Sequence, residues 1–286
     1  MSIAKTRPAA VAGTFYPGTA AALARVLHDL LAEAARHSGH GPVQGPKAII
    51  APHAGYIYSG PIAARAYAEL APARDRIKRV VLLGPVHRVP VRGLAVPGAD
   101  VASFATPLGP VTLDGDALAL LRRMPQVVVS DAAHEQEHSL EVHLPFLQTV
   151  LAEFRLVPLA VGDASAGEVA GVLDALWGGD ETLIVVSSDL SHYLEYGAAR
   201  RIDRSTAGRI VAMDCAITHE EACGGTPING LLLAAKRRGL AAEELDLRNS
   251  GDTAGAKDRV VGYGSFALRA PLAGAAPGRL GANDRR

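Results

Sequence analysis

Short apolar runs that alternate with longer helical stretches constrain the fold of this chain more than any other feature. Each run is bounded by turn residues and is too short for a helix, which is typical of strands buried on both faces. The five runs are KAIIAP at 47–52, RVVLLGP at 79–85, QVVVS at 126–130, FRLVPLAV at 154–161 and TLIVVSS at 182–188. The alternation predicts a layered α/β fold with a mixed, largely parallel central sheet flanked by helices.

Helical periodicity and weaker strand patterns complete this architecture. Helices are expected near 19–36, 60–71, 115–124, 138–153, 166–177, 198–214 and 227–239. Antiparallel or edge strands are expected at 93–98, 109–115, 244–250 and 260–268. The chain contains no internal repeat and no Gly/Ser linker, so we expect one domain over residues 1–270 and a disordered tail at 271–286.

Charge and hydropathy exclude several classes of protein. The 29 basic residues balance the 29 acidic residues, so the chain lacks the charge excess of a nucleic-acid binder. No apolar run approaches the roughly 18 residues of a membrane span. The first residues, MSIAKTRPAAVAGTFYPG, lack the apolar core of a secretory signal. We therefore expect a cytoplasmic protein with no membrane or nucleic-acid partner.

Histidines follow three of the predicted strands. His53 comes after KAIIAP, His87 after VVLLGP, and Asp189 with His192 after TLIVVSS. Because ligands bind beyond the carboxyl ends of strands in open α/β sheets, these side chains are expected to meet in one cleft. One such histidine is ordinary packing, but three point to a metal or catalytic site.

Cys223 is the fourth candidate for this cleft. It precedes a helical pattern in which Thr226 is a plausible N-cap and Pro227 the first helical residue. The positive end of a helix dipole lowers a thiol pKa and favours the thiolate needed for metal ligation or nucleophilic attack. The alternative is a buried, inert cysteine, which is how we interpret Cys215.

The segment HEQEHSLEVHLPFLQ contains a literal H-E-x-x-H pattern from His134 to His138, as in zinc proteases. The apolar helical face begins only after His138, so the helix is expected to start near Glu137 and to leave His134 outside. The two histidines would then not form a zinc site. Glu137, His138 and Glu141 either line the cleft or form a polar network.

Seven separated motifs in order resemble the Memo family, whose bacterial and archaeal members are called AmmeMemoRadiSam system protein B. They are RPAAVAGTFYPG, PHAGYIYSG, LLGPVHR, EHSLEVHLPFLQ, SSDLSHY, CGGTPI and VGYGSFAL. That family is structurally similar to the class III extradiol dioxygenases, non-haem iron enzymes that cleave catechol rings. The resemblance implies a single α/β domain with a metal site at the strand ends.

By resemblance, His53, His87 and Cys223 would be the metal ligands, and His192 would be an acid/base histidine with Asp189 beside it. Ring-cleaving relatives present two histidines and a carboxylate, whereas this chain offers a thiolate. One metal ion is expected, iron(II) first, with copper or zinc as alternatives because a thiolate is softer.

If oxygen chemistry occurs, His192 would move a substrate proton and Asp189 would orient its imidazole. Tyr56 and Tyr193 either line the pocket or pack.

Four functions remain open. The first is a metal-dependent oxidoreductase of dioxygenase type acting on a small substrate. The second is a non-catalytic module that binds a peptide or partner in the cleft, and the family name suggests radical SAM and AMMECR-type proteins as partners. The third is a Cys–His hydrolase with Cys223 as nucleophile and His192 as base. The fourth is the zinc protease. His134 and His219 receive no role.

Overall fold

Four parallel strands form the centre of a nine-stranded mixed sheet in the computed structural model, which describes residues 4–37 and 45–271. They are β2 (Ala48–Ala51), β9 (Thr182–Ser187), β3 (Arg79–Pro85) and β8 (Arg155–Val161), in that spatial order. All four were predicted from the apolar runs. Residues 272–286 of the expected tail lie outside the described residues.

The sheet continues on both sides with antiparallel pairings. Next to β2 lies β12 (Val260–Arg269), which also pairs with β11 (Ala241–Asn249) and β10 (His192–Leu194). Next to β8 lies β4 (Leu94–Val96), followed by β7 (Val127–Val129). The prediction that the run at 126–130 is buried on both faces is wrong: β7 is an edge strand, and Val129 is 55% exposed.

A separate three-stranded sheet holds the start of the chain. It consists of β1 (Lys5–Arg7), β5 (Val101–Thr106) and β6 (Gly109–Thr112). Only β6 was expected. The others were missed because β1 is three residues long and β5 lacks a long apolar run.

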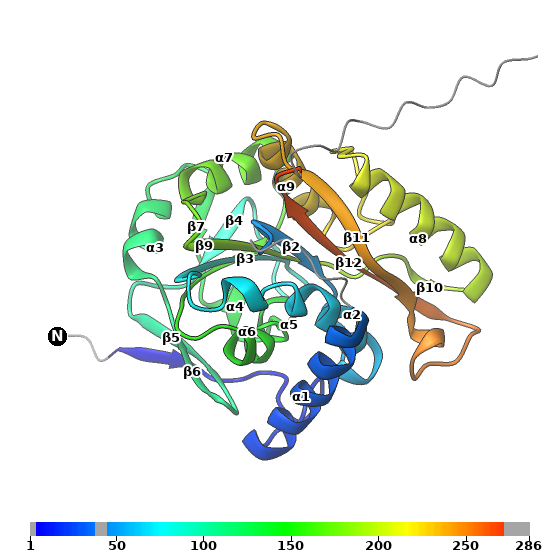
Figure 1. Cartoon of the computed structure of the whole chain (residues 1–286). Helices are drawn as coiled ribbons and strands as arrows, with labels where there is room; N and C mark the ends of the chain where they lie inside the picture. Colours follow the sequence, from blue (N-terminus) through cyan, green and yellow to red (C-terminus); the bar gives the residue numbers. More distant parts are fainter. Residues whose placement is uncertain (1–3, 38–44, 272–286) are drawn as a thin grey trace, which may run out of the picture.

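Helices cover both faces of the central sheet (Figure 1). On one face lie α1 (Ala20–His37), α2 (Tyr56–Ala68), α5 (His138–Glu141) and α6 (Leu144–Val150), and on the other lie α7 (Ala166–Leu176) and α9 (Gly225–Lys236). The long helix α8 (Tyr196–Val211) packs against β11 and β12. The remaining elements are α3 (Gly115–Leu121), α4 (Ala132–Glu135) and the 3-10 turns η1 (Ala71–Ala73) and η2 (Ser250–Asp252). In the described residues, no helix is both long and apolar enough to cross a bilayer.

The helix predicted over 138–153 is broken in two. Pro145 stands in the first turn of α6, where its missing N–H costs nothing, but it cannot continue the preceding helix. The break leaves α5 as a single turn, and this places His138 at the carboxyl edge of the sheet beside β3.

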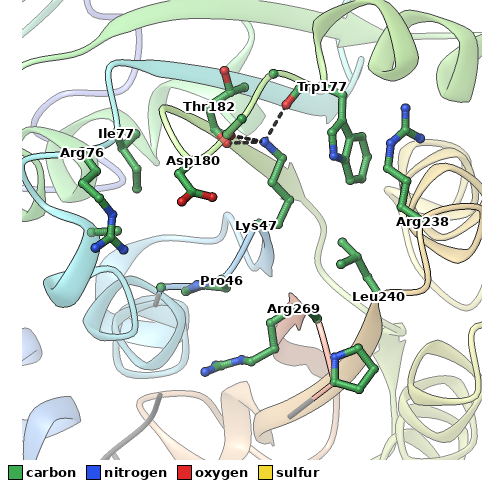
Figure 2. Close-up of a pocket in the computed structure, with 16 residues that line it drawn as sticks. Pro46, Lys47, Arg76, Ile77, Trp177, Asp180, Thr182, Arg238, Leu240 and Arg269 are labelled. Atoms are coloured by element: carbon green, nitrogen blue, oxygen red, sulfur yellow. Dashed lines mark hydrogen bonds between the residues drawn. The ribbon is translucent and has the colours of Figure 1, made fainter. Parts of the chain in front are cut away.

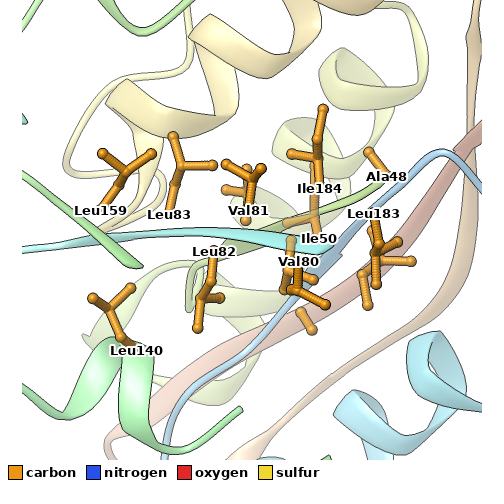
Figure 3. Close-up of a cluster of buried hydrophobic side chains, with 14 of the residues drawn as sticks. Ala48, Ile50, Val80, Val81, Leu82, Leu83, Leu140, Leu159, Leu183 and Ile184 are labelled. Carbon is orange, nitrogen blue, oxygen red and sulfur yellow. The ribbon is translucent and has the colours of Figure 1, made fainter. Parts of the chain in front are cut away.

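The core lies on both faces of the parallel strands. Along β3, Val81 and Leu83 point to one side and Val80 and Leu82 to the other, and all four are fully buried (Figure 3). Burying one such side chain contributes about 1.5–3 kcal/mol. Because this core fixes β2, β3 and β9 in register, the residues that follow each strand are held at one edge.

Candidate metal centre

Three histidine side chains converge at the carboxyl edge of the central sheet. His53 follows β2, His87 follows β3, and His138 is the first residue of α5. One ring nitrogen from each lies within 4.8 Å of the others. Neutral imidazoles are common metal ligands, so the group could bind a metal ion. The sequence predicted that His53 and His87 would meet in one cleft. It gave His138 only as a residue that could line that cleft.

Hydrogen bonds fix the ring of His53. The Ser187 hydroxyl donates to the backbone oxygen of Ser139 at 2.6 Å, so its oxygen accepts from His53 Nδ1 at 2.6 Å. The His53 proton therefore sits on Nδ1, and the Nε2 lone pair faces the Cys223 thiol 3.5 Å away. Burial lowers the pKa of His53, which keeps the ring neutral. This is the state in which an imidazole binds a metal.

The Glu137 carboxylate fixes the ring of His87 in the same way. Its carboxylate accepts from His87 Nδ1 at 2.9 Å and from the backbone N–H of His87 at 2.6 Å, which leaves Nε2 of His87 free. Burial alone would raise the pKa of Glu137, but the hydrogen bond and charge of His87 outweigh it and lower the pKa to about 2. Glu137 also caps α5 by accepting from the Ser139 N–H.

His138 completes the group without a fixed tautomer. Its Nδ1 is buried and 3.4 Å from Glu137 Oε1, in a geometry that makes no hydrogen bond. The Phe15 ring packs against it at 4.8 Å between centroids. Burial lowers the pKa of His138 to about 4, so this ring too is neutral.

Cys223 reaches the same centre from the other face of the sheet. Its Sγ lies 3.5 Å from His53 Nε2, and the residue precedes α9, which begins at Gly225 rather than at the expected Pro227. The expectation of a lowered thiol pKa is wrong. Burial, assisted by the charge of Asp189, raises the pKa of Cys223 to about 12 despite the helix end.

The distance from Cys223 to His53 fits one metal ion between them. Bond lengths of about 2.1 Å to nitrogen and 2.3 Å to sulfur at a tetrahedral angle give a ligand separation of about 3.6 Å. The two atoms are already 3.5 Å apart. The histidine nitrogens spread up to 4.8 Å, so His87 and His138 would move inward to share the same ion.

Asp189 holds the backbone of His53. Its Oδ1 accepts from the His53 N–H at 2.8 Å, and burial raises the pKa of Asp189 to about 7. The expectation that Asp189 orients the imidazole of His192 is not met, because among the described residues the Asp189 carboxylate binds the His53 backbone and makes no hydrogen bond to the His192 ring. His192 is half-buried at the same edge, and burial lowers its pKa.

The remaining residues that were predicted to line the pocket do not lie together. Tyr56 is buried in α2, where its hydroxyl donates to the Val142 oxygen at 2.8 Å and its ring packs on Phe146. Tyr193 is 64% exposed beside His192. The Glu141 carboxylate accepts hydrogen bonds from four groups of the N-terminal segment, namely the side chains of Arg7 and Tyr16 and the N–H groups of Ala10 and Val11.

The zinc-protease pattern does not form. α4 ends at Glu135 and α5 begins at His138, so no helix runs through both histidines. The His134 ring is buried with Nε2 3.1 Å from the Ala95 oxygen. The hydrolase arrangement is also unfavourable, because the Cys223 thiol faces His53 rather than His192 and has a raised pKa.

A cavity of about 440 Å³ opens beside His87 and Cys223. Its walls are the loop 85–91, the end of β8 and the start of α9, with His219 at the rim. His219 and Ser187 therefore belong to the neighbourhood of the site, although neither was predicted there. Ser187 is the last residue of β9, so the same strand-end argument would have found it.

Another cavity, of about 530 Å³, lies at the opposite end of the strands (Figure 2). Lys47 dominates it, and its ammonium donates to the backbone oxygens of Trp177, Gly179 and Thr182. All three protons are thus used within the chain. Arg238 stacks on Trp177 and pairs with Asp174. These contacts stabilise the end of the sheet opposite the histidines. Because the Lys47 and Arg238 side chains are already paired within the chain, we assign no chemistry to this cavity.

Comparison with known proteins finds one family and several relatives that cover most of the chain. A family described as Memo-like protein matches residues 7–267. A MEMO1 family protein of Methanopyrus kandleri is 36% identical over 283 residues, covering 92% of this chain and 99% of the relative. One of Aquifex aeolicus is 34% identical, covering 91% and 97%. A crystal structure of an uncharacterized Escherichia coli K12 protein covers 77% of this chain and 98% of its own at 15% identity, with a TM-score of 0.43.

Proposed function

This chain belongs to the Memo-like protein family, and from that premise we propose that it is a metal-dependent protein of oxidoreductase type. In this proposal His53, His87 and Cys223 bind one iron(II) ion, and His138 is available as a fourth ligand. The substrate is a small molecule that enters the cavity beside His87.

One observation carries the proposal. The Cys223 thiol and His53 Nε2, which lie within hydrogen-bonding distance of each other, are separated by a distance that a shared metal ion would also fit. Both His53 and His87 donate their other ring nitrogen to a fixed acceptor, as metal-ligating histidines almost always do.

The bound metal would supply Lewis acidity and one-electron redox chemistry. The chain's own residues would do the rest. Ser187 and Asp189 orient the ring and backbone of His53, and Glu137 orients His87. His192, neutral and half-buried at the same edge, would hold or move a proton of the substrate.

Metal analysis of the full chain purified without added metal tests the proposal. We expect near-stoichiometric iron in the wild type and less than a tenth of that in His53→Ala and Cys223→Ser. His28→Ala, an exposed histidine on α1, is the matched control and should keep the metal. Circular dichroism of each variant shows whether it is folded.

Three outcomes would contradict the proposal. If folded wild type binds neither iron, copper nor zinc after incubation with each ion, there is no metal centre. If Cys223→Ser keeps its metal whereas His138→Ala loses it, the ligands are three histidines and the thiol assignment is wrong. Bound metal without oxygen consumption on any small-molecule panel would instead favour the partner-binding module.

A further inference from the structure

We infer that Ser139 is the positioning residue of the metal centre and holds its three histidine rings in one arrangement. The part of this inference that concerns metal binding rests on the proposed function, whereas the part that concerns the rings needs no metal. Ser139 follows His138 on α5 and is fully buried. Its carbonyl oxygen, its N–H and its hydroxyl each hold a different part of the site.

The carbonyl oxygen of Ser139 sets the tautomer of His53. It accepts the hydroxyl proton of Ser187 at 2.6 Å, so the Ser187 oxygen is left to accept from His53 Nδ1, also at 2.6 Å. Without the Ser139 oxygen, the Ser187 hydroxyl could turn its proton toward Nδ1, and the ring proton would then sit on Nε2. Nε2 would have no lone pair for a metal ion. The metal-binding state of His53 therefore depends on a residue of α5.

The N–H of Ser139 holds the carboxylate that orients His87. Glu137 Oε1 accepts from this N–H and from His87 Nδ1, both at 2.9 Å. One carboxylate oxygen thus connects the first turn of α5 to the His87 ring. A displacement of α5 would therefore disturb the supports of His87 and His53 together.

The hydroxyl of Ser139 docks α5 on the end of β3. It donates to the Pro85 oxygen at 2.8 Å, two residues before His87. Gly84 lies against the same hydroxyl: a Cβ at Gly84 would be 2.7 Å from the Ser139 hydroxyl oxygen and 3.0 Å from Leu140 Cδ2. Because position 84 carries no side chain, α5 can lie directly against the strand.

These contacts join α5 to two neighbouring strands. Ser187 ends β9, Pro85 ends β3, and the two strands pair in parallel. Because Ser139 binds both strand ends as well as its own turn, the three histidine rings depend on one docking position of α5. Residues that orient metal-ligating histidines typically contribute about 10- to 100-fold to metal affinity. We expect Ser139 to contribute within this range.

Heteronuclear NMR of the histidine rings tests the arrangement without metal. In chelator-treated wild type, His53 and His87 should each show a single tautomer with the proton on Nδ1. Gly84→Ala should push α5 from β3 and give both rings mixed tautomers. Ser139→Ala, which keeps the N–H and the carbonyl, should give a detectable minor tautomer. The double variant should be closer to wild type than Gly84→Ala, because the missing hydroxyl makes room for the new Cβ.

Competition for iron(II) between the protein and a chelator measures the effect on metal binding. Ser139→Ala should lose about tenfold in affinity, and Gly84→Ala up to about 100-fold. The matched control is Thr206→Val, which removes another fully buried hydroxyl, bonded to the Ile202 oxygen of α8 at 3.0 Å. It should lower the midpoint of urea unfolding as Ser139→Ala does, but leave the tautomers unchanged and the affinity within about twofold.

Wild-type tautomers in folded Ser139→Ala and Gly84→Ala would overturn the inference, as would unchanged iron affinity in both. An equal loss of affinity in Thr206→Val would also overturn it, because the effect would then be one of stability alone. Ser139→Ala adds no volume, so it decides the matter if Gly84→Ala does not fold. The two proposals fail separately: a wild type that binds no metal, but whose tautomers respond to these variants, contradicts only the proposed function.

Discussion

Two histidines outside the metal group, His134 and His143, are buried and neutral. Burial lowers the pKa of His134 to about 4 and that of His143 to about 3. His143 Nδ1 hydrogen-bonds the Tyr67 hydroxyl at 2.7 Å, and its Nε2 has no partner among the described residues. A proton on either ring would place a charge in a buried site, so the folded state disfavours it.

The folded state should therefore lose stability in acid. As the pH falls below about 6.5, these two histidines become protonated in the unfolded chain but stay neutral in the folded chain. Each of them therefore lowers the free energy of unfolding by about 2 kcal/mol at pH 5 relative to pH 7.5. His143→Gln keeps a hydrogen-bonding group but does not titrate, so this loss should shrink by about 2 kcal/mol. Urea unfolding with a chelator present measures it, and His28→Gln should behave as the wild type. An unchanged loss in His143→Gln would refute the assignment.

At the level of single residues, the sequence allowed only part of the site to be predicted. The strand-end positions of His53 and His87 follow from local pattern, and the structure brings them together. Local pattern could not show that burial would outweigh the helix dipole at Cys223. It also could not show that Asp189 would hold the His53 backbone rather than the His192 ring. Both depend on what the fold packs around the side chain.

One buried ion pair ties the N-terminal strand β1 to α5. Arg7 on β1 donates to Glu141 on α5 at 2.5 Å, and both side chains are almost fully buried. Arg7 also donates to the backbone oxygens of His134 and Glu137. The pair thereby ties the first strand to the turn that carries His138.

Glu141→Gln should be strongly destabilising, because it leaves the guanidinium of Arg7 buried without its counter-ion. We expect a loss of about 3 kcal/mol in the free energy of unfolding, together with faster tryptic cleavage after Lys5, which lies on the same strand. The comparison is Glu244→Gln, which breaks the exposed pair with Arg204 and should cost less than about 1 kcal/mol. Similar losses in the two variants would show that burial of the pair does not matter.

Among the helices and strands, the sequence pattern predicted a strand correctly where both of its faces are buried in the core. The strands β2, β3, β8 and β9 are apolar on both faces and were predicted within two residues. The short β1 and β10 have no such pattern, since their positions depend on pairing with distant strands. The break between α5 and α6 was missed even though Pro145 marks it.

The site joins distant parts of the whole molecule, since His53, His87, His138 and Cys223 come from four separate segments. A metal bound there would join segments from both faces of the sheet. Because it would bind the folded state and not the unfolded state, it would raise the free energy of unfolding. At a free metal concentration 100 times Kd, the gain is about 2.7 kcal/mol, or a rise in Tm of roughly 5 °C or more. Thermal melts with metal and with chelator measure it.

His53→Ala should melt at one temperature under both conditions, whereas His219→Ala, at the cavity rim, should keep the shift. An equal shift in both variants would place the stabilising metal elsewhere.

The strand β12 lies inside the sheet although it comes from the end of the described chain. It pairs with β2 on one side and with β10 and β11 on the other. During synthesis at about 5–20 residues per second, β2 therefore waits roughly ten seconds or more with an open edge after it has been made. Such an edge can pair with other chains. The nascent protein thus depends on β12 to close this edge of the sheet, and we expect loss of β12 to cause aggregation of the chain during synthesis.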